Sequence, residues 1–474
     1  MCASPSATPT ASAAPTPPSS SHAGRAGSAC IPARGGSEED DEDDDEDEGD
    51  DEDDGMNNEV VITGVGCVTP LGLSLEALST ALREGRNGFG EVAGFDASAY
   101  PCRLGAEVLD LELGDFIESS KTYIDRTSAF ALAACASALK DAHWLGDESV
   151  GLVLGTAWGC MDSLGLFAQK LVEGKPKFVP PLPFTHSYAN APNSLASIEF
   201  KLRGFNACLT CGHTAGLAAV EYACRRVALG KERRLLAGGA EGLSEAIFHA
   251  YCLRGELNAA DAPLPYDPAS KGMLLGEGAA IVAIEEAESA RQWGAPVLAR
   301  LLGWAACQGQ PDCGLRIADC GLKSAIGNRQ SEMLPAVADG LARSMREALE
   351  RGGVRPGDVD AIIGIGCGLP ALDAAELDAA RAVFGDCRFR VSDSGPKSAI
   401  GNRQSAICPV LTSVKGFLGE AMGAGGPLSL AAALACLEDH FLPGAEPLGR
   451  PPRTLLVNAA DPNGACVSLV VGSA

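Results

Sequence analysis

The amino-acid sequence predicts an α/β fold in which two similar halves pack together. Of its 474 residues, 46% are apolar, only 5% are aromatic and 57 are glycine, a composition typical of tightly packed α/β proteins. Short apolar runs alternate with helical patterns from about Val60, and the alternation starts again after about residue 297. Each half also closes on strand-like runs, so layers of strands and helices around one core are expected.

Local patterns predict the elements of the first half. VVITGVGCVT is typical of a buried strand that ends at Pro70, and a helix is expected from about Ser74, with Glu76 in its first turn. Residues 124–143 and 213–229 have helical apolar spacing and many small side chains. Continuous apolar runs predict further strands at 150–156, 234–241 and 279–286.

The second half repeats this pattern. Strands are predicted at LARLLGWAA, VDAIIGIG, FRVS, TLLVNAA and CVSLVVG. Helices are predicted at 333–351, 374–384 and 417–437. The expected organisation is therefore a tail over 1–55, an N-terminal half over 56–297 and a C-terminal half over 298–474.

The first 55 residues differ in composition from the rest of the chain. Residues 1–37 are rich in Ser, Ala, Pro and Gly, and sixteen acidic residues broken by one Gly follow between Glu38 and Asp54. With a net charge of −14, this segment cannot bury enough apolar surface to fold, so a disordered, solubilising tail is expected. Two alternatives are a start of translation at Met56 and a dedicated binding tail.

Charge and hydropathy exclude several classes of protein. A formal net charge of −25 argues against nucleic acid as a partner. No apolar run is long enough to predict a membrane span, and no signal peptide is expected. The eighteen cysteines lack disulfide-like spacing and most lie in apolar stretches, so a reducing, cytoplasmic location is expected. Cys208, Cys211 and His213 have no second ligand pair at a suitable spacing, so no metal site is expected.

The chain also contains a sharp internal repeat. RIADCGLKSAIGNRQS at 316–331 and RVSDSGPKSAIGNRQS at 390–405 agree at twelve of sixteen positions. The repeat is too local to be the duplication of the fold. Two interpretations stay open: a copied loop without a function of its own, and a pair of matched loops that contact one ligand or partner.

Four stretches of the sequence together resemble β-ketoacyl synthases of the elongating, fatty-acid type. The resemblance covers roughly residues 60–474, with the stretches in the family's order and spacing. They are VVITGVGCVTPLG, LPFTHSYANAPNSLASIEFKLRG, GLAAVEYACRRVALGKERRLLAGGAE and LPYDPASKGMLLGEGAAIVAIEEAESARQWGA. The resemblance implies the thiolase fold, with two βαβαβαββ halves that form a layered αβαβα core, and dimerisation through the core sheet.

The residue at the family's nucleophile position is a histidine. Active members carry a cysteine thiolate at a helix N-terminus, where the dipole and nearby amides lower the thiol pKa and hold the oxyanion. Counting forward from Leu202-Arg203-Gly204, or back from Glu241, places His213 there. Cys211 lies two residues earlier on the incoming strand, about 6–7 Å away along an extended chain, so it is not expected to reach this position.

The two family histidines, which bind the thioester carbonyl and stabilise the enolate, are also replaced. VDAIIGIG is followed by CGLPALDAAE, in which Pro370, Asp373 and Glu376 fit the family frame, and this frame places the first histidine position at Ile365. The second has two possible registers. KGFLGE places Lys415 and Glu420 at the family's lysine and histidine, whereas KSAIGN places Lys397 and Asn402 there. We favour Lys415 and Glu420, because the glycine-rich sequence that follows continues in register into the last helix.

Lys415 has two interpretations. It is either a solvated residue before an apolar helix or a buried lysine in a structural ion pair, for which the family frame suggests Glu376 as the partner.

Two further features indicate a particular branch of the family. Where the family has a glycine-rich gating loop, this chain has Ala460-Asp461-Pro462-Asn463-Gly464. GCGLPALDAAE resembles the AGVPxLD-type sequence of chain-length factors, which also lack the cysteine and pair with an active ketosynthase. Those proteins often carry glutamine at the nucleophile position, whereas this chain has His213.

Three functions are consistent with these residues. The favoured one is a non-catalytic, chain-length-factor-type subunit in a heterodimer with an active ketosynthase, within a fatty acid or polyketide synthase. The second is an active β-ketoacyl synthase, an acyltransferase that performs decarboxylative Claisen condensation with His213 or Cys211 as nucleophile and Lys415 as charge stabiliser. The third is an acyl-binding scaffold that uses the old acyl pocket, for which a homodimer is expected. The expected partner in each is acyl carrier protein with its phosphopantetheine thioester, and no other cofactor is expected.

Overall fold

A single sheet organises the part of the chain that the computed structural model describes, which is residues 58–174, 176–310, 329–385, 390–391, 408–445 and 448–474. Its first half contains β1 (Val60–Val68), β4 (Gly151–Gly155), β5 (Asn206–Leu209), β6 (Arg234–Glu241) and β7 (Gly278–Glu286). Their spatial order is β5-β4-β6-β7-β1, with β4 parallel to both neighbours and β7 antiparallel to both.

The second half of the sheet has the same order. Its strands are β8 (Ala299–Gln308), β9 (Ala361–Ile363), β11 (Val410–Thr412), β12 (Thr454–Ala460) and β13 (Ala465–Ser473), with β10 (Arg390–Val391) added outside β11. Counted from the start of each half, the order is third, second, fourth, fifth, first in both. Antiparallel pairing of β1 with β8 joins the halves. The predicted pair of βαβαβαββ halves is therefore confirmed.

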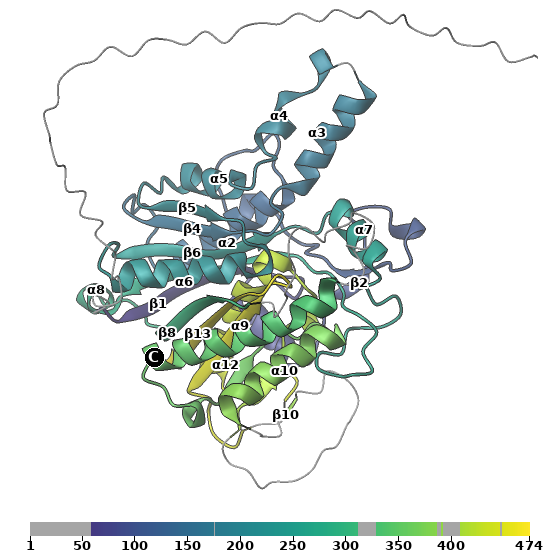
Figure 1. Cartoon of the computed structure of the whole chain (residues 1–474). Helices are drawn as coiled ribbons and strands as arrows, with labels where there is room; N and C mark the ends of the chain where they lie inside the picture. The colour runs from purple at the N-terminus through teal and green to yellow at the C-terminus, as the bar shows by residue number, and fades with distance from the viewer. Residues whose placement is uncertain (1–57, 175, 311–328, 386–389, 392–407, 446–447) are drawn as a thin grey trace, which may run out of the picture. The chain divides into compact units, whose positions relative to one another are not determined.

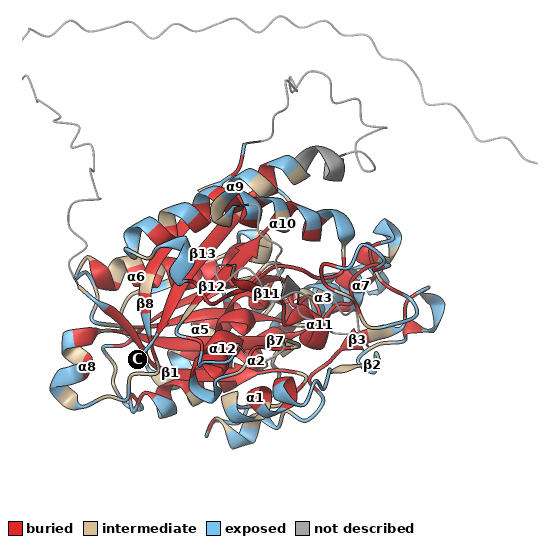
Figure 2. Cartoon of the chain, turned by 90° about the horizontal axis from the view of Figure 1, so that it is seen from below, coloured by how far each residue is buried: buried red, intermediate tan, exposed pale blue. Residues whose placement is uncertain are grey.

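Helices form the other layers of the fold (Figure 1). α6 (Ala215–Ala228) and α12 (Gly425–Asp439) pack on each other and on strands of both halves, so they form the central layer. α2 (Arg126–Asp141) covers the outer face of the first half, and α9 (Arg329–Arg351) with α10 (Pro370–Phe384) covers that of the second. Figure 2 shows the sheet and α12 buried, while the outer helices carry exposed residues. The predicted αβαβα layering is thus confirmed.

Helix ends follow local chemistry. α1 (Leu75–Arg83) begins as predicted, because the Ser74 side chain accepts a hydrogen bond from the Ala77 amide. The helix predicted at 417–437 is wrong in its first part. A short α11 (Lys415–Leu418) ends at Gly419, which has a φ of 74°, and α12 begins only at Gly425.

The segment between β4 and β5 contains helices that the sequence patterns did not predict. They are α3 (Met161–Glu173), α4 (Pro181–Thr185) and α5 (Ala191–Phe200), and Figure 1 shows α3 and α4 standing out from the layered core. The remaining elements are β2 (Phe89–Glu91), β3 (Leu104–Ala106), α7 (Glu245–Arg254) and α8 (Ala287–Trp293). Among the described helices, none has both the length and the apolarity needed to cross a membrane.

Several predictions lie outside the described residues. These are the tail over 1–55 with its alternatives, Met56, and nearly all of both repeat copies, including Lys397 and Asn402. They stay predictions, as do the boundaries of the two halves.

Candidate functional site

His213 lies at the N-terminus of the central helix α6. It sits in a turn, Gly212–Thr214, that joins β5 to the helix. Gly212 has a φ of 70°, and a Cβ there would lie 1.9 Å from Asp461 Oδ2, so this turn requires glycine. The His213 side chain is 10% exposed. The residue that occupies the predicted nucleophile position is therefore largely buried at a helix N-terminus.

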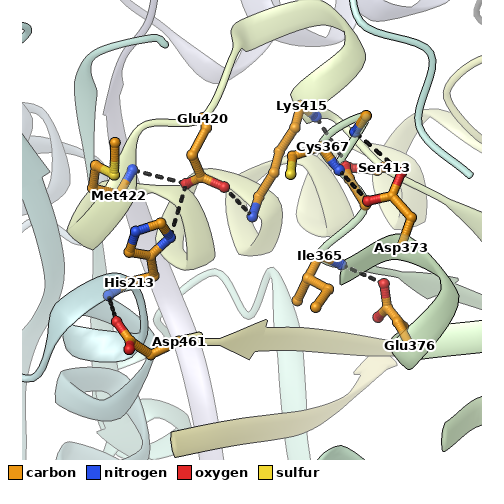
Figure 3. A network of polar contacts seen from close by, with 12 residues as sticks. His213, Ile365, Cys367, Asp373, Glu376, Ser413, Lys415, Glu420, Met422 and Asp461 are labelled. Atoms are coloured by element: carbon orange, nitrogen blue, oxygen red, sulfur yellow. Dashed lines mark hydrogen bonds and ion pairs between the residues drawn. The ribbon is translucent and has the colours of Figure 1, made fainter. Parts of the chain in front are cut away.

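Both ring nitrogens of His213 face protein groups. Nε2 lies 3.1 Å from the Tyr251 hydroxyl on α7. Nδ1 lies 3.9 Å from Glu420 Oε1 (Figure 3). The Tyr251 hydroxyl also lies 3.5 Å from Met422 Sδ. Burial, with a smaller effect of Glu420, raises the pKa of Tyr251, so the phenol stays protonated. Tyr251 could not be predicted as a site residue, because no sequence motif in α7 marks this position.

Lys415 and Glu420 form a buried ion pair beside His213. Lys415 Nζ donates to Glu420 Oε2 at 2.6 Å, and the side chains are 9% and 1% exposed. Burial alone would raise the pKa of Glu420, but Lys415 and then His213 outweigh this effect, so the pKa is lowered. Burial would lower the pKa of Lys415, and Glu420 outweighs it in the opposite direction. The structure thus brings together His213, Lys415 and Glu420.

Glu376 is not the ion-pair partner of Lys415, so that prediction is wrong. Its Oε2 accepts hydrogen bonds from the Ile365 amide and the Tyr266 hydroxyl, both at 2.7 Å, and its Oε1 accepts from Asn458 Nδ2 at 3.0 Å. Glu420, five residues from Lys415, takes the ammonium instead. Burial raises the pKa of Glu376, although these three donors oppose the shift.

Ile365 lies in the turn after β9, where its apolar side chain is fully buried. Figure 3 shows it in the same region as His213 and Lys415. Asp373, at the start of α10, fixes the following turn, since its carboxylate accepts from the amides of Cys367 at 2.9 Å and Gly368 at 3.1 Å. Burial raises the pKa of Asp373 to about 6 despite these amides. These hydrogen bonds fix the turn, yet Ile365 contributes no polar side chain to the site.

Glu241 connects the end of β4 to the turn before α12. Its buried carboxylate accepts hydrogen bonds from the amides of Ala157 at 2.6 Å, Trp158 at 3.1 Å and Gly423 at 3.3 Å. Burial raises the pKa of Glu241 to about 7, although these donors favour the charged form. This contact positions the turn that carries Glu420 and Met422 against the first half of the sheet.

Asp461, in the loop that replaces the family's gate, contacts the N-terminus of α6. Its Oδ2 accepts a hydrogen bond from the His213 amide at 2.9 Å, and its Oδ1 accepts from the Asn463 amide at 3.0 Å. The side chain is almost fully buried. The sequence marked this loop as altered but did not indicate this contact.

The nearby cysteines do not form a metal site. Cys211 follows β5, which ends at Leu209, rather than lying on the strand as expected. Burial raises the pKa of the Cys208 thiol to about 11 and also raises that of Cys211. Within the described ranges, no group of three or more His, Cys, Asp or Glu side chains has metal-binding geometry.

The geometry limits the chemistry that these positions support. Residue 213 carries an imidazole whose two nitrogens face Tyr251 and Glu420, so no thiolate stands at the helix N-terminus. Ile365 can neither donate a hydrogen bond nor hold a proton. The carboxylate of Glu420 is an acceptor and neutralises the Lys415 ammonium. These residues form a buried polar network in which most groups hydrogen-bond or pair with one another.

Comparisons with known proteins agree with this architecture. The model of the β-ketoacyl synthase N-terminal domain matches residues 57–290, and that of the C-terminal domain matches 316–447. A 3-oxoacyl-[acyl-carrier-protein] synthase 2 from Synechocystis is 29% identical over 81% of this chain and 86% of its own length. The actinorhodin polyketide β-ketoacyl synthase 2 of Streptomyces coelicolor is 31% identical, with the same two coverages.

A solved structure shares the fold over most of the chain. The ishigamide ketosynthase/chain length factor has a TM-score of 0.74 and 25% identity, and the match covers 88% of this chain and 100% of that one. Together with the two family models and the relatives above, this similarity spans both halves of the sheet. The chain therefore belongs to the β-ketoacyl synthase family.

Proposed function

We propose that this chain is a non-catalytic, chain-length-factor-type subunit that pairs with an active ketosynthase in a fatty acid or polyketide synthase system. The observation that carries the proposal is the joint replacement of three chemical positions, by His213, Ile365 and Glu420. Condensation needs a nucleophile for the acyl group and donors that stabilise an enolate and an oxyanion. A buried isoleucine supplies no donor, and a carboxylate repels the developing negative charge.

The names of similar proteins support this role. The ishigamide structure is described as a ketosynthase/chain length factor, which is the pairing proposed for this chain. Another structure with this fold, at 19% identity and a TM-score of 0.72, is described as a type II polyketide acyl carrier protein in complex with its ketosynthase. We therefore propose acyl carrier protein, with its phosphopantetheine thioester, as the second partner.

The pairing surface that we propose is centred on β5. This strand pairs only with β4 among the described residues, so its other edge is free to accept a strand from the partner. Exposed apolar side chains gather in the segment next to it. They are Trp158, Leu164, Leu166, Leu171, Val172, Phe178, Leu182, Phe184, Tyr188 and Ile198. Such a concentration favours a protein partner, and the matching fold of the ishigamide pair favours a ketosynthase chain as that partner.

The purified chain alone is expected to show no decarboxylation or condensation with malonyl- and acyl-carrier protein. Mixing with an active ketosynthase, sought first among the neighbouring genes, is expected to give a stable 1:1 complex and turnover. Carrier-protein products and the intact mass of each subunit are measured by mass spectrometry. Turnover or a covalent acyl adduct on the isolated chain contradicts the proposal, as does a self-dimer that ignores the ketosynthase.

Replacing Ile198 with aspartate is expected to weaken the complex at least tenfold. Ile198 lies on α5 beside β5 and is 72% exposed, so the change leaves the monomer's core intact but places a charge in the interface. Leu109→Asp is the matched control, since Leu109 is also 72% exposed but follows β3, outside the main sheet. Affinity is measured by titration with the ketosynthase. Equal weakening by both variants would place the interface elsewhere.

A further inference from the structure

We infer that Asp461 silences this site separately from the missing cysteine, by holding its carboxylate on the backbone amide of residue 213. The inference deepens the proposed function and rests on it. The Asp461 carboxylate is then a second obstacle to catalysis at this site, because restoring a cysteine at position 213 would not by itself restore a reactive thiolate.

The contact between the Asp461 carboxylate and the His213 amide is held in place by the local structure of both segments. Asp461 Oδ2 lies 2.9 Å from the His213 amide nitrogen, and no Cβ fits at Gly212 because of this carboxylate. The loop is fixed by its own hydrogen bonds, from the Asp461 amide to the Ala465 carbonyl at 2.8 Å and from the Gly464 amide to the Asp461 carbonyl at 2.9 Å. The carboxylate therefore stays on the amide without help from a ligand (Figure 3).

The position of the Asp461 carboxylate matters because it occupies the amide of residue 213. An amide at a helix N-terminus stabilises a thiolate and can hold an oxyanion. A carboxylate that already accepts this hydrogen bond removes the donor and adds a negative charge about 3 Å from the amide nitrogen. Both effects oppose a thiolate at residue 213. The neighbouring thiol shows the same influence: burial raises the pKa of Cys211, and Asp461 adds to the shift.

A second carboxylate provides an internal comparison. Glu420 lies 3.9 Å from the His213 ring, but its Oε1 accepts from the Met422 amide at 2.8 Å, not from that of His213. Neutralising Glu420 together with Lys415 removes the neighbouring ion pair without leaving an unpaired charge, and it leaves the His213 amide occupied. Neutralising or removing Asp461 acts on the amide itself, so the two changes separate the nearby charged groups from amide occupancy.

The test introduces a thiol at position 213 and measures its reactivity in the full chain. The variants are H213C, H213C/D461A, H213C/D461N and H213C/K415M/E420Q. Each is treated with iodoacetamide between pH 6 and 10, and alkylation at position 213 is followed by peptide mass spectrometry with fragment-ion localisation. D461N keeps an oxygen acceptor but loses the charge, so it remains informative if D461A disturbs the loop. Urea unfolding reports whether each variant is folded.

In H213C the new thiol is expected to have a pKa at or above its ordinary value. H213C/D461A is expected to lower it by at least one unit, which raises the alkylation rate near neutral pH about tenfold. H213C/D461N should show a smaller increase, and H213C/K415M/E420Q less than half that of H213C/D461A. No increase in either Asp461 variant, or an equal increase with K415M/E420Q, overturns the inference. Turnover by the wild-type chain would instead contradict the proposed function, so the two failures are distinguishable.

Discussion

Replacing Lys415 with methionine is expected to lower the free energy of unfolding by about 3–5 kcal/mol, because the Glu420 carboxylate would stay buried without its counter-ion. The double variant K415M/E420Q should recover most of this loss, since it leaves no uncompensated charge. Lys170→Met is the matched surface control: Lys170 and Glu173 are about half exposed, and their pair contributes little. Urea unfolding at pH 7 measures all three, and a K415M variant as stable as the wild type would contradict the expectation.

The effect of K415M should also depend on pH. The pKa of Glu420 is lowered in the folded chain, so the stabilisation by the pair is present above the unfolded pKa of about 4.3 and is lost as the pH falls through the folded pKa. The pKa of Lys415 is raised, so its contribution is present below about 10.4 and is lost as the pH rises through the folded value. The difference between K415M and wild type is therefore expected to be largest near neutral pH and to shrink in acid.

Replacing Gly216 with alanine is expected to destabilise the chain by about 3 kcal/mol through overpacking. Its added Cβ would lie 2.3 Å from the Gly423 carbonyl oxygen and 2.5 Å from Pro427 Cγ, so α6 and the turn before α12 must separate. This movement would also draw His213 away from Glu420.

Gly165→Ala is the matched control for this change. Gly165 lies inside α3 with nothing within 4 Å of its added Cβ, so alanine there is expected to stabilise by about 1 kcal/mol through helix propensity. Thermal and urea unfolding compare the two variants. Equal changes in the free energy of unfolding would show that Gly216 is not required for the close contact between α6 and the turn at Gly423.

Much of the fold could be predicted because its strands are short, apolar and regularly spaced. β6 has the predicted bounds, and β1, β4 and β7 differ from theirs by a residue or two. The start of α12 was missed because Phe417, Leu418 and the small residues after them continue the pattern of the helix toward its N-terminus, and the positive φ values at Gly419 and Met422 reveal the break. Helices α3 to α5 were missed because their exposed apolar faces blur the amphipathic pattern.

The positions of the candidate site residues could be predicted from the sequence, but the contacts between their side chains could not. Fixed landmarks located His213, Ile365 and Glu420 by counting, and the structure places His213 beside Glu420. The contacts of Tyr251 and Asp461 with His213 join residues 38 and 248 positions apart, and no local pattern encodes such a pair. The partner of Lys415 was wrong because the family frame has no carboxylate at position 420. In this chain, Glu420 is the nearer acceptor.

The burial of α12 has a consequence for how the chain is made. Every residue from Gly425 to Leu437 is buried, so this helix has no face suited to water. The N-terminal half leaves the ribosome first, with the surface of α6 that α12 will cover still open, and the long segment between Ala228 and Gly425 must be synthesised before that cover arrives. During this interval the nascent chain is expected to need chaperones, and fragments that end before α12 are expected to aggregate rather than to fold as a half-sized protein.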